Sequence, residues 1–84
     1  MASNSHTVFI KDEEHVLSAE DIVAAAKRET PRRVNAYYVD IDGRRFPPKQ
    51  LLRAATRTSK SFDTGVAVRT LQALGFKVVK MGTE

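Results

Sequence analysis

The spacing of hydrophobic residues changes from two to about 3.6 along the chain, and this change separates strands from helices. In residues 36–41 the alternation places Tyr37, Val39 and Ile41 on one face of a strand. Asp42 and Gly43 follow, and this pair favours a type I′ hairpin turn, in which both central residues need a positive φ. A two-residue turn fixes the register. The predicted pairs are Ile41 with Arg44, Asp40 with Arg45, and Val39 with Phe46.

A short helix over residues 49–57 is predicted after this hairpin. Pro47 and Pro48 suit its start, because proline lacks the N–H that a first helical turn leaves unpaired. One face of the helix is apolar and holds Leu51, Leu52 and Ala55. The opposite face is basic and holds Lys49, Arg53 and Arg57, at positions i, i+4 and i+8.

The next helix, over residues 64–74, has signals at both ends. Asp63 is the predicted N-cap, Phe62 and Ala67 form a hydrophobic staple, and Gly75 is the residue just past the end. The residues expected to face the core are Ala67, Val68, Leu71 and Leu74. The outer face then holds Gly65, Val66, Arg69, Gln72 and Ala73.

The N-terminal third contains another helix and a weak strand. Ser18 is the predicted N-cap, Asp21 completes a capping box, and Leu17 packs on Ile22 as a staple. The helix should run to about Glu29, before Pro31, and its buried residues are expected to be Ile22, Val23 and Ala26. Residues 7–11 are an expected edge strand, residues 12–15 an acidic turn, and residues 76–80 a last strand.

The predicted order is strand, helix, hairpin, helix, turn, helix and strand, which is an α+β fold. We expect three helices packed on one small, mainly antiparallel sheet. The helix pair indicates a helix-turn-helix, winged-helix-like arrangement in which the hairpin precedes the helices. Residues 7–80 form the predicted domain, with a disordered tail at 1–6 and a frayed tail at 81–84.

Composition and charge narrow the class of protein. The 84 residues suffice for one domain, and the absence of cysteine excludes disulfides and thiolate metal sites. With no apolar run of membrane-spanning length, we expect a cytoplasmic protein without membrane contact.

Charge is distributed unevenly along the chain. Residues 1–31 hold three basic and six acidic side chains, a net charge of −3. Residues 32–84 hold eleven basic and four acidic side chains, a net charge of +7. Residues 44–60 contain six Lys or Arg and no acid, which favours an anionic partner.

Part of the chain resembles a known family. The segments that carry the resemblance are residues 38–49 (YVDIDGRRFPPK), 61–64 (SFDT) and 71–76 (LQALGF). They resemble the module with DGxxYPPK and LGF motifs found at the N-terminus of some modification-dependent HNH restriction endonucleases and beside other DNA-defence domains. Phe46 stands where that family has Tyr. The resemblance covers residues 37–79 and implies that the module engages DNA, not that it cleaves it.

The helix pair supplies most of the predicted DNA contacts. In a helix-turn-helix the first helix crosses the backbone and the second enters the major groove, where Arg pairs with guanine and Gln with adenine. The predicted phosphate contacts of the first helix are Lys49, Arg53 and Arg57. The predicted base-facing residues of the second are Thr64, Arg69 and Gln72.

Three further cations complete this predicted set. Arg44 and Arg45 lie at the hairpin and would touch the backbone as a wing, unless Arg45 pairs with Asp40 across the strands. Lys60 precedes a helix N-terminus, where free N–H groups attract phosphate, although the carboxylate of Asp63 competes for those donors.

Catalysis and metal chemistry are not indicated. His6 and His15 are the only imidazoles and lack a third ligand at a recognisable spacing, and no nucleophile or phosphate-loop motif occurs. We therefore expect no enzyme activity, no cofactor and no metal. The expected partner is double-stranded DNA, with a homodimer or protein partner adding affinity, in a regulator or a restriction, antiviral-defence or mobile-element accessory. The alternative is a protein-interaction module, an adaptor or an inhibitor of a DNA-processing enzyme, docking through Val66, Ala73 and Val79.

Overall fold

The computed structural model describes residues 5–34 and 36–81, and within them strands and helices are mixed along the chain. The elements are β1 (Ser5–Ile10), β2 (Glu13–Ser18), α1 (Ala19–Arg28), β3 (Tyr37–Ile41), β4 (Arg44–Phe46), α2 (Pro48–Thr56), α3 (Thr64–Ala73) and β5 (Val78–Lys80). The α+β class predicted from the sequence is confirmed.

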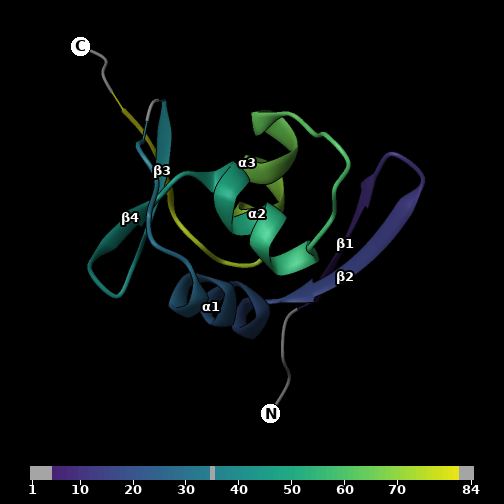
Figure 1. Ribbon diagram of the computed structural model, residues 1–84, viewed down its shortest axis with the longest axis horizontal. Helices are drawn as coiled ribbons and strands as arrows, with labels where there is room; N and C mark the ends of the chain where they lie inside the picture. Colours follow the sequence, from purple (N-terminus) through teal and green to yellow (C-terminus); the bar gives the residue numbers. More distant parts are fainter. Residues whose placement is uncertain (1–4, 35, 82–84) are drawn as a thin grey trace.

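The strands form two separate antiparallel sheets, so the expectation of a single sheet is wrong. One is the ribbon β1–β2, and the other has the order β4-β3-β5. In Figure 1 the ribbon lies at the right and the three-stranded sheet at the left, with α2 and α3 between them and α1 below. Helix α2 contacts α1, α3, β2 and β3. Helix α2 is therefore the central element of the packing.

The β1–β2 ribbon was not predicted, because its second strand was interpreted as an acidic turn at residues 12–15. The chain reverses instead at Lys11, whose φ is 57°, and Ile10 pairs with Glu13. The inward positions of β2 include Glu13 and His15, which hide the hydrophobic alternation. Strand β1 begins at Ser5, inside the predicted tail 1–6, and residues 1–4 lie outside the described residues.

The second hairpin has the predicted register. Val39 pairs with Phe46, and Asp42 and Gly43 both have positive φ, at 55° and 81°. Strand β5 pairs with β3 through Val78 to Lys80 and starts two residues later than expected. The next residue, Met81, donates its N–H to the carbonyl of Ala36 at 2.7 Å, and the rest of the predicted frayed tail, 82–84, lies outside the described residues.

The predicted helix starts are confirmed. The hydroxyl of Ser18 accepts from the Asp21 N–H at 3.3 Å, and the Asp21 carboxylate accepts from the Ser18 N–H at 2.9 Å. The Asp63 carboxylate accepts from the Val66 N–H at 3.3 Å, and Pro48 occupies the first turn of α2. Ser18 and Asp63 accept hydrogen bonds from N–H groups that the first turn of a helix leaves unpaired, and Pro48 has no N–H to leave unpaired.

The helix ends lie one residue earlier than predicted. Helix α2 stops at Thr56, and Arg57 takes a left-handed conformation with φ 58°. Helix α3 stops at Ala73, and Gly75 has φ 95° as expected. The Phe76 N–H then donates to the Leu71 carbonyl at 3.0 Å, a Schellman closure that keeps Phe76 out of the following strand.

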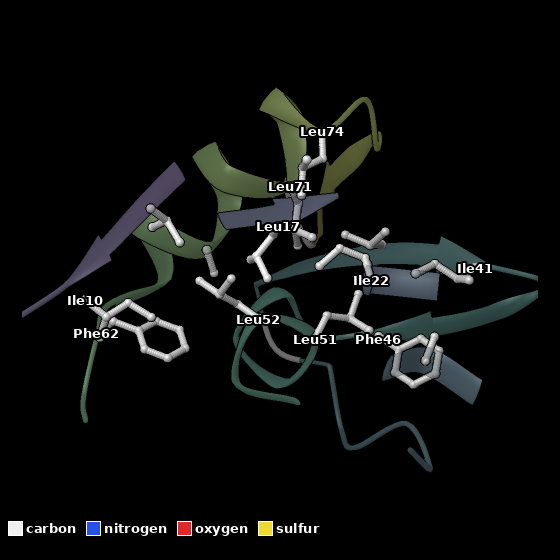
Figure 2. Close-up of a cluster of buried hydrophobic side chains, with 14 residues drawn as sticks. Ile10, Leu17, Ile22, Ile41, Phe46, Leu51, Leu52, Phe62, Leu71 and Leu74 are labelled. Carbon is white, nitrogen blue, oxygen red and sulfur yellow. The ribbon is translucent and has the colours of Figure 1, made fainter. Parts of the chain in front are cut away.

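The core continues from the ribbon to the three-stranded sheet through α2. Figure 2 shows Ile10 and Phe62 at one end of this cluster and Ile41 and Phe46 at the other. Leu51 and Leu52 are fully buried between them. On α1 the buried residues include Ala25, whereas Val23 is only half-buried.

On α3 the inward face differs from the prediction at three positions. Val66, expected on the outer face, packs against the core, and Thr70 is 2% exposed. Val68, expected to face the core, is half-buried and is not part of the core cluster. The Thr70 hydroxyl can be buried because it donates to the Val66 carbonyl at 2.8 Å. Val66 is half-buried, which reduces the apolar area that it could add to the docking patch of the protein-interaction alternative.

Candidate nucleic-acid interface

The connector after α1 is held against α2 by one side chain, Gln50. Its amide nitrogen donates to the Glu29 carboxylate at 3.1 Å and to the Thr30 carbonyl at 2.8 Å. Its amide oxygen accepts from the Arg32 N–H at 2.9 Å. Because all these bonds start from the N-terminal half of α2, they fix the connector beside the basic face of that helix.

This arrangement produces an open groove of about 440 Å³ between the connector and α2. Its lining residues are Glu29, Arg32, Arg33, Pro47, Lys49, Gln50, Arg53 and Ala54. We define the cationic groove by the four positive side chains in this set, Arg32, Arg33, Lys49 and Arg53. The one acid present, Glu29, is already bonded to Gln50.

An aromatic ring lies beneath two of these cations. The Arg53 guanidinium carbon is 5.1 Å from the centroid of the Phe62 ring, and the Lys49 ammonium nitrogen is 6.0 Å from it. Both distances are in the range of cation–π attraction, which orients a long side chain without neutralising it. Phe62 is buried as the predicted staple residue before α3, so the ring is itself fixed by the core.

Carboxylates do not neutralise these positive side chains. Within residues 5–34 and 36–81 the sole ion pair is between His15 and Glu13, 3.1 Å apart. The predicted pairing of Arg45 with Asp40 is wrong, although the two residues are opposite in the register. Asp40 instead accepts from the Gly43 N–H at 3.0 Å, and Arg45 stacks on the Tyr38 ring at 4.6 Å.

Arg44 has a structural role that the sequence did not indicate. Its guanidinium donates to the Ala26 carbonyl at 2.9 Å and to the Glu29 carbonyl at 3.4 Å. The Ala26 carbonyl also accepts from the Glu29 N–H at 3.3 Å, and a positive charge at this end of α1 complements the helix dipole. Arg44 thus helps to cap α1 with two of its five N–H donors.

The other predicted contact residues are spread over the surface. Arg57 is exposed but has left the α2 helix, so the expected third position of the basic face is not formed. Lys60 is near enough to Glu13 to help lower the pKa of that carboxyl. Thr64, at the start of α3, lines a small hollow together with Arg33 and Lys49.

Arg69 and Gln72 are exposed on α3, as predicted. Neither lines the cationic groove or the hollow shared with Thr64. Helices α2 and α3 are joined by residues 57–63, a longer connection than the 3–4 residues typical of a helix-turn-helix. Lys49 therefore shares the groove with Arg53 and the small hollow with Thr64, whereas Arg69 and Gln72 lie on a separate stretch of α3.

Arg32 and Arg33 were missed in the predicted set. The only signal was their adjacency after Pro31, in a stretch without periodicity. What places them is the set of hydrogen bonds from Gln50, a residue whose role depends on tertiary structure.

A second polar cluster ties the 57–63 segment to β2. The Thr58 hydroxyl donates to the Glu13 carboxylate at 2.8 Å, and the His15 ring bonds the same oxygen at 3.1 Å. The bond from Thr58, followed by that from His15, lowers the pKa of the Glu13 carboxyl from its ordinary value of 4.5. Both bonds stabilise the ionised form.

Over 5–34 and 36–81, no three His, Cys, Asp or Glu side chains are grouped so that they could hold a metal ion. None of the described helices has the length and apolar character needed to cross a membrane. No family model, no curated protein and no solved structure matches the chain.

Proposed function

We propose that this chain is a non-catalytic DNA-binding protein whose cationic groove holds phosphates of a duplex backbone. The observation that carries the proposal is the convergence of four cations, two from the connector and two from α2, in one groove. Guanidinium and ammonium groups are the usual phosphate donors, and Arg matches a phosphate with two parallel bonds. Glu29, the single acid of the groove, keeps its negative charge while it accepts from the Gln50 amide, so the four cations leave the lining with a net charge of +3.

The other predicted contact residues indicate how the duplex would be oriented on the helix pair. Thr64 borders the same surface as Lys49 and Arg33, so α3 would start at the bound backbone. Arg69 and Gln72, farther along α3, are the proposed base-contacting residues, and Arg45 on the hairpin is a proposed further backbone contact. A role as a regulator, or as an accessory of restriction, antiviral defence or a mobile element, is supported by the resemblance of residues 37–79.

Charge reversal in the groove tests the proposal. In Lys49→Glu/Arg53→Glu two phosphate contacts are lost, each worth about 1 kcal/mol. Duplex affinity should then fall by more than about 30-fold, since 1.4 kcal/mol is tenfold. The matched control is Lys27→Glu/Lys77→Glu, which changes the net charge equally at two exposed lysines outside the groove.

The measurement is fluorescence anisotropy with a labelled random-sequence duplex, with circular dichroism to verify the fold of each variant. Equal losses in the groove variant and the control would reduce the effect to net charge and overturn the proposal. Undiminished binding by the groove variant would overturn it as well.

A further inference from the structure

Phe9 is exposed in a position that folding does not explain. Its side chain is 65% exposed on the outer face of β1, while the next residue, Ile10, is 1% exposed. Val16 on β2 shares this outer face and is 60% exposed. Single exposed apolar side chains are common on protein surfaces, so Phe9 becomes informative only through the residues around it.

Phe9 lines a second hollow, of about 500 Å³, which lies between the ribbon and the start of α3. We call it the aromatic hollow, and its lining residues are Phe9, Ile10, Lys11, Lys49, Ser61, Phe62, Asp63 and Val66. The hollow is wide and open to solvent, so it suits one face of a flat group rather than an enclosed small molecule. Val16, the other exposed side chain of this face, does not line the aromatic hollow.

The aromatic hollow combines an apolar lining with positive charge. Ile10 and Phe62 are buried and Val66 is half-buried, whereas Lys11 and Lys49 are exposed. The carboxylate of Asp63 caps α3 by accepting from the Val66 N–H. Glu14, opposite Phe9 in the strand register, does not line the hollow. Asp63 keeps its negative charge, so with Lys11 and Lys49 the lining has a net charge of +1. A planar apolar group attached to a phosphate would place the apolar part on Phe9 and the phosphate near the two ammonium groups.

Lys49 connects the aromatic hollow to the cationic groove, because it lines both. A strand whose phosphates lie in the groove would thus bring its next nucleotides to Phe9. We infer that Phe9 stacks on an unpaired nucleobase of a DNA strand that the cationic groove holds by its phosphates. This inference rests on the proposed function and adds to it the class of DNA, one with an unpaired base.

Stacking of a base on an aromatic ring tolerates any sequence, because every base has a π face. It is worth enough for a clear test, since removal of one such ring changes affinity by about tenfold or more. The preference it creates is for a duplex carrying an unpaired base over a perfect duplex, whose bases are already stacked on their neighbours.

The test measures the affinity of the chain for three ligands by fluorescence anisotropy. They are a short perfect duplex, the same duplex with one unpaired thymine, and thymidine monophosphate. The affinity for the free nucleotide is measured by its competition with a labelled duplex. The wild-type chain should bind the duplex with the unpaired thymine about tenfold more tightly than the perfect one. Phe9→Leu keeps an apolar side chain but removes the π face, so it should abolish this preference and leave binding of the perfect duplex unchanged. Val16→Leu is the matched control and should retain the preference.

Each other outcome overturns the inference. Equal wild-type affinity for the two duplexes would refute stacking while leaving the proposed function intact, whereas no binding of either would refute both. A preference that survives in Phe9→Leu, or that is lost equally in Val16→Leu, would show that the aromatic hollow is not the cause. Thymidine monophosphate binding as tightly as the duplex with the unpaired thymine would make the ligand a free nucleotide.

Discussion

Replacing Lys49 and Arg53 together by glutamine should halve the contribution of the groove to the salt dependence of duplex binding. Each phosphate that a cation neutralises contributes about −0.9 to the slope of log K against log salt concentration. Four cations line the groove, so the groove should contribute about −3.6 to the wild-type slope. With Arg32 and Arg33 alone remaining, the groove should contribute about −1.8. The measurement is a series of anisotropy titrations at increasing NaCl concentration.

The double variant should remain folded. Each side chain loses a contact with the Phe62 ring, at 6.0 Å and 5.1 Å, worth about 0.5–1 kcal/mol at an exposed site. A loss of 1 kcal/mol lowers the melting temperature of a domain of this size by about 4–8 °C, which circular dichroism resolves. Lys27→Gln/Lys77→Gln removes equal charge outside the groove and should keep the wild-type slope. A slope in the groove variant equal to that of the wild type, or a wild-type slope near zero, would refute the reasoning.

Three further predictions concern the residues that shape the fold around the groove. Gln50→Ala removes three hydrogen bonds to the connector, so it should cost about 1–3 kcal/mol of stability and move the groove's contribution to the salt slope toward about −1.8, because Arg32 and Arg33 are released; an unchanged slope would contradict this role. Gly43→Ala places a Cβ where φ is 81° but where no atom lies within 4 Å, so urea unfolding should show a loss of about 1–2 kcal/mol from the backbone alone. For Glu13, the lowered pKa means that its stabilisation is complete above the ordinary value of 4.5 and is lost as the pH falls through the folded-state value. The difference in melting temperature between wild type and Glu13→Gln should therefore shrink on acidification below pH 4.5, and a difference that grows would show the opposite linkage.

Local chemistry made much of the fold predictable. The Asp42-Gly43 turn defined the second hairpin to the exact residue pair, because the turn conformation allows one register only. The caps at Ser18 and Asp63 located two helix starts for a similar reason, since each satisfies N–H groups within three residues. Where a single local interaction decides the backbone, its residues are adjacent and can be recognised in the chain.

The β1–β2 ribbon could not be found in this way. The inward side of β2 carries Glu13 and His15, which are poor strand formers and look like turn residues. Glu13 is held in place by Thr58, 45 residues away, whose hydroxyl bonds the Glu13 carboxylate. The strand is thus stabilised by a contact between segments that are distant in the sequence. Hydrophobic periodicity does not reveal such a contact.

The candidate site was predictable only in part, for the same physical reason. The wheel of residues 49–57 correctly placed Lys49 and Arg53 on an exposed face. It could not show that Arg57 turns into the left-handed region, nor that Gln50 brings Arg32 and Arg33 across to face them. Helical geometry predicts which side chains share a face of one helix. A groove also requires a second segment, whose position depends on tertiary contacts.

Charge density along the chain is a poor guide to which cations are available for a ligand, and Arg44 and Lys49 show why. Both belong to the acid-free segment 44–60, and by sequence they are equivalent. The fold uses two of the five N–H donors of Arg44 to bond two carbonyls at the end of α1, and its guanidinium lies 5.2 Å from the Phe46 ring centroid, so these contacts hold the side chain against the protein. Lys49 is stabilised only by the face of an aromatic ring, which leaves its three N–H donors for a ligand. A cation held by a π face is oriented and still unsatisfied, and this condition favours binding of a polyanion at the groove rather than at the hairpin.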